Sequence, residues 1–192
     1  MQSLSDEQVM LRYQNGEVYA MDELIRRYQK PVYRFVCRLS CSAAEAEDIA
    51  QEVFLRVHQS KDTYRPIGKF STWIFSIAHN LNTSRLRKTK WFGLWPVQDE
   101  ESLEPKEFAS PDPSPQEAAS SVEETDIVKR CVQSLPFPQR EALILREYEH
   151  MSYQEIADVL DKPQGTIKTL VYRARDNLKT KLLPYLKEGY HG

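Results

Sequence analysis

The residues best suited to chemistry lie near the carboxyl end, on a helix expected from residue 164 to 182. At helical spacing, Ile167, Val171, Ala174 and Leu178 form one apolar stripe. The other side carries hydroxyl, amide and basic groups: Gln164, Thr166, Lys168, Thr169, Tyr172 and Arg173. Such groups donate hydrogen bonds to phosphates and base edges. This side of the helix is therefore predicted to bind DNA.

A second, shorter helix is expected just before it, over residues 152–160. Ser152 and Glu155 have the spacing of a capping box, which marks a helix start. Pro163 disfavours helical dihedrals in the residue before it, so the first helix ends there. Two helices around a tight turn are typical of a helix-turn-helix that reads the major groove. A helical hairpin with an ordinary solvated face is the alternative.

A further candidate site combines a loop, residues 61–69, with the helix expected from residue 70 to 90. Aromatic rings stand there beside basic and amide side chains, as single-stranded nucleic acid requires for stacking and phosphate contacts. The candidates are Tyr64, Arg65, Lys69, Phe70, Trp73, His79, Asn80, Arg85, Arg87 and Lys88. Taken singly, Phe70 and Trp73 are more typical of core residues than of base-stacking platforms.

The helix expected from residue 42 to 60 has a different character. Its buried stripe is apolar, whereas Asp48, Gln51 and Glu52 lie together on another side with Leu55 among them. The result is an acidic face with an apolar contact in it. For an isolated helix, a solvated surface is the favoured interpretation of this pattern.

Composition places these segments in an all-α protein. Few glycines and helical periodicity along most of the 192 residues favour helices throughout. The net charge of −2 conceals an asymmetry, because residues 96–126 hold ten acidic residues and one basic residue. Outside that segment, 25 basic residues stand against 18 acidic ones. This distribution indicates nucleic-acid-binding parts joined by an acidic segment.

We therefore expect two small helical domains, 1–95 and 122–192, joined by a flexible linker over residues 96–121. The linker is acidic and rich in proline, the composition of an extended tether. The apolar segment 91–95, just before it, is consistent with a partner-binding site or with packing on the first domain.

Other classes of protein are disfavoured. Cys37, Cys41 and Cys131 form no pairable framework, and the four histidines are scattered without a nucleophile or metal-ligand motif. We therefore expect no catalytic residues, metal, cofactor or small-molecule substrate. The sequence shows neither a signal peptide nor an apolar run long enough to span a membrane, which predicts a soluble, cytoplasmic protein.

Three blocks resemble the extracytoplasmic-function sigma factors, the two-domain branch of the sigma-70 family of bacterial RNA polymerase. Residues 46–54 (AEDIAQEVF) are similar to the polymerase-binding helix of that family. Residues 70–80 (FSTWIFSIAHN) with Arg85 resemble its promoter-melting helix. Residues 135–140, 152–160 and 163–175, with PQGTIK at 163–168, resemble its promoter-reading domain. The order and spacing of the blocks make the resemblance specific.

The resemblance implies a role for each face. Asp48, Gln51, Glu52 and Leu55 would bind the clamp coiled coil of core RNA polymerase. The clamp coiled coil and the flap of the two large subunits are the expected points of contact with polymerase. The loop and helix at residues 61–90 would capture a flipped base of the −10 element and bind the opened strand. The helix at 164–182 would read the −35 element as duplex. The acidic linker would thread through the polymerase in place of nucleic acid.

The family also implies a regulon of the stress or envelope-response kind and a dedicated anti-sigma factor, often held at the membrane. Ser84, Gln164 and Leu170 depart from the common pattern, which leaves the promoter sequence open. A conventional helix-turn-helix regulator that binds duplex DNA without polymerase is the alternative. That reading accounts for the carboxyl third of the chain but gives Asp48, Glu52 and Trp73 no role.

Overall fold

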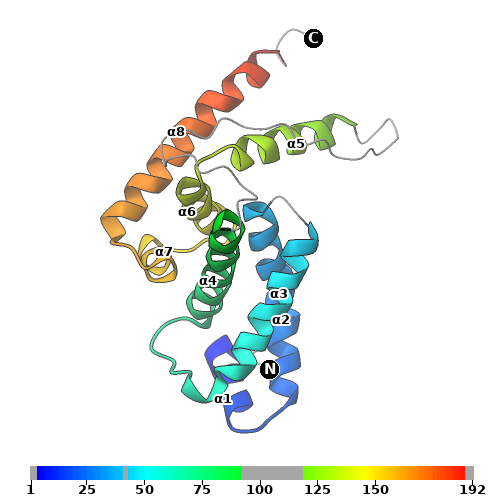
Figure 1. Cartoon of the computed structure of the whole chain (residues 1–192), viewed down its shortest axis with the longest axis vertical. Coiled ribbons are helices and arrows are strands. Elements are labelled where there is room, and N and C mark those ends of the chain that lie inside the picture. Colours follow the sequence, from blue (N-terminus) through cyan, green and yellow to red (C-terminus); the bar gives the residue numbers. More distant parts are fainter. Residues whose placement is uncertain (1–3, 41–42, 92–118, 189–192) are drawn as a thin grey trace.

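The computed structural model describes residues 4–40, 43–91 and 119–188, and every regular element within these ranges is helical (Figure 1). The elements are α1 (Asp6–Gln14), α2 (Tyr19–Leu39), α3 (Ala43–Gln59), the 3-10 helix η1 (Lys61–Thr63), α4 (Phe70–Trp91), α5 (Ala119–Gln133), α6 (Phe137–Glu147), α7 (Tyr153–Leu160) and α8 (Gln164–Glu188). The expected all-α class is confirmed.

Helices α1–α4 form an amino-terminal bundle around large apolar side chains. Leu24, Val32, Phe35, Ile49 and Ile74 are almost fully buried between them. Pro31 lies inside α2, yet α2 continues as one helix from Tyr19 to Leu39. Proline removes a single backbone N–H from the ladder, and the burial of Val32 and Phe35 directly after it holds that turn in place.

Helices α5–α8 form the carboxyl-terminal half, in which α6 is buried on two sides. Leu143 packs with Leu135 and Ala174, toward α5 and α8. Ile144 and Leu145 belong instead to the large cluster that includes the core of α1–α4. A run of four consecutive buried apolar residues, 142–145, is the sequence signature of such two-sided burial.

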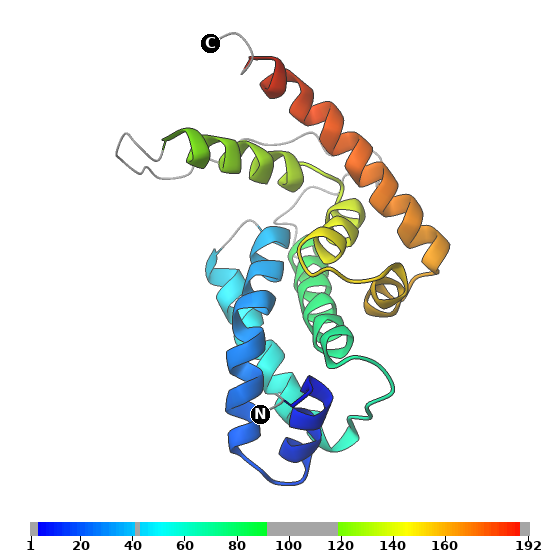
Figure 2. The ribbon, with the colours of Figure 1, turned by 180° about the vertical axis from the view of Figure 1, so that it is seen from behind.

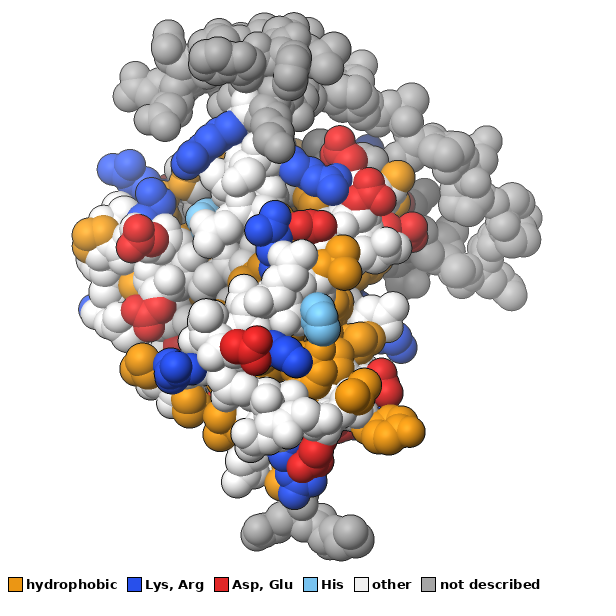
Figure 3. Space-filling view, turned by 60° about the horizontal axis from the view of Figure 1, so that its bottom comes forward, with side chains coloured by type: hydrophobic (Ala, Val, Ile, Leu, Met, Phe, Trp, Pro, Cys, Tyr) orange, Lys and Arg blue, Asp and Glu red, His pale blue; other side chains and the backbone are white. Residues whose placement is uncertain are grey.

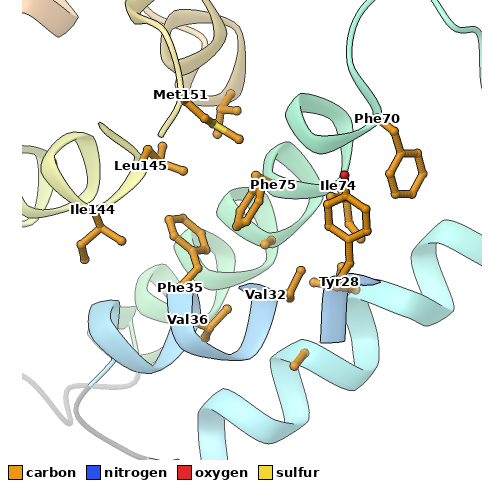
Figure 4. Close-up of a cluster of buried hydrophobic side chains, with 14 of the residues drawn as sticks. Tyr28, Val32, Phe35, Val36, Phe70, Ile74, Phe75, Ile144, Leu145 and Met151 are labelled. Atoms are coloured by element: carbon orange, nitrogen blue, oxygen red, sulfur yellow. The ribbon is translucent and has the colours of Figure 1, made fainter. Parts of the chain in front are cut away.

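The two halves share this cluster. Phe35 and Phe75 meet edge to face, with ring centroids 5.2 Å apart, and Leu145 and Met151 point toward them from α6 and the α6–α7 turn (Figure 4). In both ribbon views α4 lies between the α2–α3 pair and α7 (Figures 1 and 2). The halves are thus in direct contact in this arrangement.

The domain boundaries stay a prediction, because residues 92–118 lie outside the described residues. That range holds most of the expected linker and most of the apolar segment 91–95. Helix α5 begins at Ala119, inside the segment assigned to the linker. Of the three cysteines, Cys37 and Cys131 are free thiols, and Cys41 also lies outside the described residues.

Candidate nucleic-acid interface

The expected helix-turn-helix is present in α7 and α8. Ser152 Oγ accepts from the backbone N–H of Glu155 at 3.2 Å, and Glu155 Oε2 accepts from the N–H of Ser152 at 2.7 Å. The capping box is therefore confirmed. Asp161 ends α7 in the left-handed region, at φ 50°, and its N–H donates to the carbonyl of Ala157. This residue turns the chain toward Pro163 and the start of α8.

Helix α8 separates its apolar and polar sides as expected. Ile167, Val171 and Ala174 are fully buried, and the six residues predicted to bind DNA are all exposed: Gln164, Thr166, Lys168, Thr169, Tyr172 and Arg173. Tyr172, at 73% exposure, borders a shallow surface hollow of about 430 Å³ together with Tyr153, Lys168, Thr169 and Arg175. The predicted reading face is therefore open to a ligand.

The loop at residues 61–69 rests on a cluster of three aromatic rings. The ring of Tyr64 lies 4.8 Å from that of Trp73 and 6.0 Å from that of Phe70, centroid to centroid. Tyr64 is 3% exposed and Phe70 is completely buried, whereas Trp73 is half-buried. Burial raises the pKa of the Tyr64 hydroxyl to about 12, assisted by the carboxylates of Glu7 and Asp6. In this arrangement Tyr64 and Phe70 support the loop from beneath, and neither ring is open to a base.

The outer surface of the loop is exposed and partly basic. The Arg65 guanidinium donates to the loop carbonyls of Asp62 and Tyr64 at 3.2 and 2.9 Å. Ile67 is 93% exposed. Lys69 Nζ lies 2.7 Å from Glu155 Oε1 of α7. Figure 3 shows the corresponding end of the molecule, where apolar side chains lie exposed among basic and acidic ones.

The polar side of α4 is partly covered by the carboxyl-terminal half. His79 Nδ1 lies 2.7 Å from Glu141 Oε1, and Glu141 is one of two buried polar side chains in the described core. Further along α4, Asn80 and Arg87 are exposed, and Arg85 lies 3.6 Å from Asp48 of α3. The side chain of Lys88 lies outside the described residues.

The acidic face of α3 is open. Asp48, Gln51 and Leu55 are exposed, and Leu55 is a large apolar residue with 55% of its surface accessible. Glu52 is intermediate and accepts from Arg56 Nε at 2.9 Å. The structure brings these four residues onto one helix surface. Their role as a protein-binding face stays a prediction.

Four residues around the loop and α4 were not anticipated from sequence as part of the site. Glu141 and Glu155 come from the carboxyl-terminal half, and Glu7 and Gln14 come from α1. Glu155 was interpreted only as a capping residue, a role it also has. Glu141 is a carboxylate directly before the apolar run 142–145, which was the available signal. The others become neighbours of the loop only through tertiary packing.

Burial and hydrogen bonds act on Glu7 in opposite directions. Burial raises the pKa of its carboxyl group, but hydrogen bonds from the backbone N–H of Phe70, from its own N–H and from Ser5 outweigh that effect, with help from the charge of Lys69. The pKa of Glu7 is therefore lowered. Within the described ranges, no group of three or more potential metal ligands occurs. No helix in that part of the chain is long and apolar enough to cross a bilayer.

Two parts of the chain match models of known families. Residues 24–92 match the model of sigma-70 region 2, which spans most of α2, then α3, the loop and α4. Residues 125–178 match the model of sigma-70 region 4, which includes the helix-turn-helix.

Similar proteins extend over nearly the whole chain. The RNA polymerase sigma-H factor of Pseudomonas aeruginosa is 33% identical over 190 residues, covering 96% of this chain and 97% of that protein. The ECF RNA polymerase sigma-E factor of Escherichia coli K12 is 31% identical, covering 97% and 98%.

Two solved structures share the fold. CnrH in complex with the cytosolic domain of CnrY has a TM-score of 0.69 at 19% identity, covering 92% of this chain and 96% of that one. The sigma factor RpoE in complex with the anti-sigma factor NepR, from Bartonella quintana, has a TM-score of 0.64 at 24% identity, covering 84% and 95%.

Proposed function

This chain belongs to the sigma-70 family, in its extracytoplasmic-function group, and we propose that it binds core RNA polymerase and directs it to open a specific set of promoters. The observation that carries the proposal is the occurrence of region 2 and region 4 in one chain and in this order. A helix-turn-helix alone would fit any duplex-binding regulator. Region 2 adds the means to engage polymerase and an opened strand.

Each surface has a part in this function. The face of α3 formed by Asp48, Gln51, Glu52 and Leu55 binds the clamp coiled coil. The loop and α4 bind the opened −10 element, with Arg65, Lys69, Arg85 and Arg87 available to phosphates. The exposed face of α8 reads the −35 element. Unstacking a base costs a few kcal/mol, and its capture at the loop offsets part of that cost.

The same membership supports an inhibitory partner and a cellular location. The Bartonella quintana homologue of the same fold was solved with an anti-sigma factor, and we propose that this chain is held inactive by a protein of that kind. Polymerase supplies the chemistry of RNA synthesis, so the chain itself needs no catalytic residue or cofactor. Its working place is the cytoplasm, where polymerase and promoters are.

Run-off transcription with purified core enzyme tests the function. We expect promoter-dependent transcripts from a subset of genomic templates, and none from core enzyme alone. Changing Asp48 and Glu52 together to Lys should abolish core binding while −35 duplex binding persists. The matched control places the same charge change at the α1–α2 end, with Glu17→Lys and Asp22→Lys. A chain that binds duplex DNA yet never engages polymerase would be a conventional regulator instead.

A further inference from the structure

Helix α1 holds the loop at residues 61–69 at both of its ends. Near the first end, Gln14 Nε2 donates to the carbonyls of Asp62 and Tyr64 at 3.2 and 3.4 Å. At the other end, Glu7 Oε1 accepts from the backbone N–H of Phe70, the first residue of α4, at 2.8 Å. Glu7 and Gln14 lie seven positions apart, about 10 Å along a helix axis. One rigid element therefore sets the spacing between the two ends.

Glu7 accepts a hydrogen bond from the start of α4 that no side chain of the loop next to it accepts. Early N–H groups of a helix lack intrahelical partners, and a side chain just before the helix usually accepts from them. Lys69 precedes α4, and an ammonium group has no acceptor. Glu7 supplies the missing oxygen from a distant part of the chain, and its negative charge also suits a helix amino terminus.

Helix α1 is itself firmly placed. Asp6 accepts from Arg27 and from the Tyr28 hydroxyl, both on α2, each at 2.5 Å. Val9 and Met10 are buried against the bundle. By contrast, residues 65–69 are all exposed, and no neighbouring atom lies within 4 Å of the Cβ position that would be built on Gly68. Besides the hydrogen bonds of Arg65 and the contact of Lys69 with Glu155, the shape of the loop depends on how its ends are held.

We propose that α1 fixes the conformation of the loop at residues 61–69 and so determines how this loop binds a flipped promoter base. Glu7 and Gln14 are the positioning residues. This inference rests on the proposed function, because it concerns base capture by a sigma factor. Neither residue touches DNA in this role. They act through the loop backbone, so they affect which base is accepted.

The first test uses the free protein and needs no polymerase. Amide hydrogen exchange is followed over residues 65–70 in Glu7→Ala, Glu7→Gln and Gln14→Ala. We expect the Phe70 amide to exchange about tenfold faster in Glu7→Ala and the loop amides to follow. Glu7→Gln keeps an acceptor oxygen and should restore most of the protection. Unchanged exchange in Glu7→Ala and Gln14→Ala overturns this role of α1.

The matched control is Gln8→Ala. Gln8 belongs to the capping box of α1, where its Oε1 accepts from the N–H of Ser5 at 3.0 Å, and no hydrogen bond joins it to the loop among those found in the described residues. This substitution weakens α1 without removing a loop contact. It should lower the melting temperature and leave the Phe70 amide protected relative to global unfolding.

The second test asks for base selectivity in the holoenzyme. Promoters carrying each of the four bases at every −10 position are compared for open-complex formation. Glu7→Ala and Gln14→Ala should reduce discrimination at one position by about tenfold, while core affinity and −35 binding stay unchanged. Gln8→Ala and Glu7→Gln should keep discrimination near that of the parent.

Each outcome has a distinct meaning. Faster amide exchange in the loop with unaltered discrimination among −10 bases would overturn the role in base positioning. Glu7 and Gln14 would then only stabilise the loop. If activity falls only in step with melting temperature, as in Gln8→Ala, the same conclusion holds. If the parent holoenzyme opens no promoter at all, the proposed function fails, and the exchange experiment still decides whether α1 shapes the loop.

Discussion

The two candidate DNA-binding surfaces are built in opposite ways. The −35 face lies on a single helix, α8, whose buried residues Ile167 and Val171 set which side chains face outward. The −10 surface is assembled from η1, the loop and α4, and it is braced by α1 and partly covered by α6 and α7. The first surface is open, whereas carboxylates of the other half occupy part of the second.

The side chains of the two surfaces are therefore positioned by different means. On α8, the orientation of each contact residue follows from helical periodicity alone, so a change at one residue stays local. On the −10 surface, Lys69 and His79 already have acidic partners, Glu155 and Glu141. If the opened strand binds here, as proposed, it must displace these carboxylates to reach Lys69 and His79. Binding at this surface would then be coupled to the contact between the halves.

The strongest test of the α8 account removes its anchor. Ile167→Ala deletes a fully buried side chain and should cost about 2–5 kcal/mol of unfolding free energy, from lost burial and the remaining cavity. Thr166→Ala, at the exposed neighbouring position, should stay within about 0.5 kcal/mol of the parent. Urea unfolding followed by circular dichroism measures both. Equal effects would mean that α8 is not oriented by its apolar stripe.

On the exposed side of α8, Arg173→Ala should weaken binding to −35 duplex by about 1–3 kcal/mol if the guanidinium holds a base edge. Fluorescence anisotropy with matched and mismatched duplexes measures the change. The control is Arg26→Ala, which removes the same charge from an exposed residue of α2. Equal weakening on every duplex would assign Arg173 to a phosphate and leave base reading to its neighbours.

The surface on α8 could be predicted from sequence more fully than the −10 surface. The capping box of Ser152 and Glu155, the buried stripe of α8 and all six exposed residues of its reading face agree with the periodicity. Local spacing suffices there because helix geometry alone relates one side chain to the next. The acidic face on α3 was identified in the same way.

Predicting the −10 surface requires knowledge of tertiary packing, which the spacing of residues along one helix does not contain. Tyr64 and Phe70 were expected at the DNA, but packing buries both rings beneath the loop. The continuity of α2 through Pro31 depends on its buried neighbours. Contacts such as His79 with Glu141 join residues 62 positions apart. Only the packing of the two halves brings such residues together, and periodicity carries no signal of it.

The pair formed by His79 and Glu141 offers a smaller effect that probes this packing. A double-mutant cycle of His79→Ala and Glu141→Gln should give a coupling free energy of about 1–2 kcal/mol, because the hydrogen bond involves an ionisable group at a largely buried site. Thermal or urea unfolding provides the four values. Additive single effects would indicate that the halves do not hold this contact in solution.

The pair formed by the exposed Lys69 and the partly buried Glu155 should give the smallest effect, visible in its pH dependence. The hydrogen bond from Lys69 lowers the pKa of Glu155 to about 2, and the same bond raises the pKa of Lys69. The stabilisation from Glu155 is complete above its ordinary pKa of 4.5 and is lost as the pH falls from there toward 2.

On the basic side, the stabilisation from Lys69 is lost only above its ordinary pKa of 10.5. Because solvent screens Lys69, Glu155→Gln should lower the melting temperature at pH 7 by only about 1–2 °C. The difference from the parent should shrink steadily below pH 4. Since Glu155 also accepts from the N–H of Ser152, Lys69→Met separates the two contacts. A loss equal to that of Glu155→Gln would place the stabilisation in the ion pair between the halves, and no loss would place it in the helix cap.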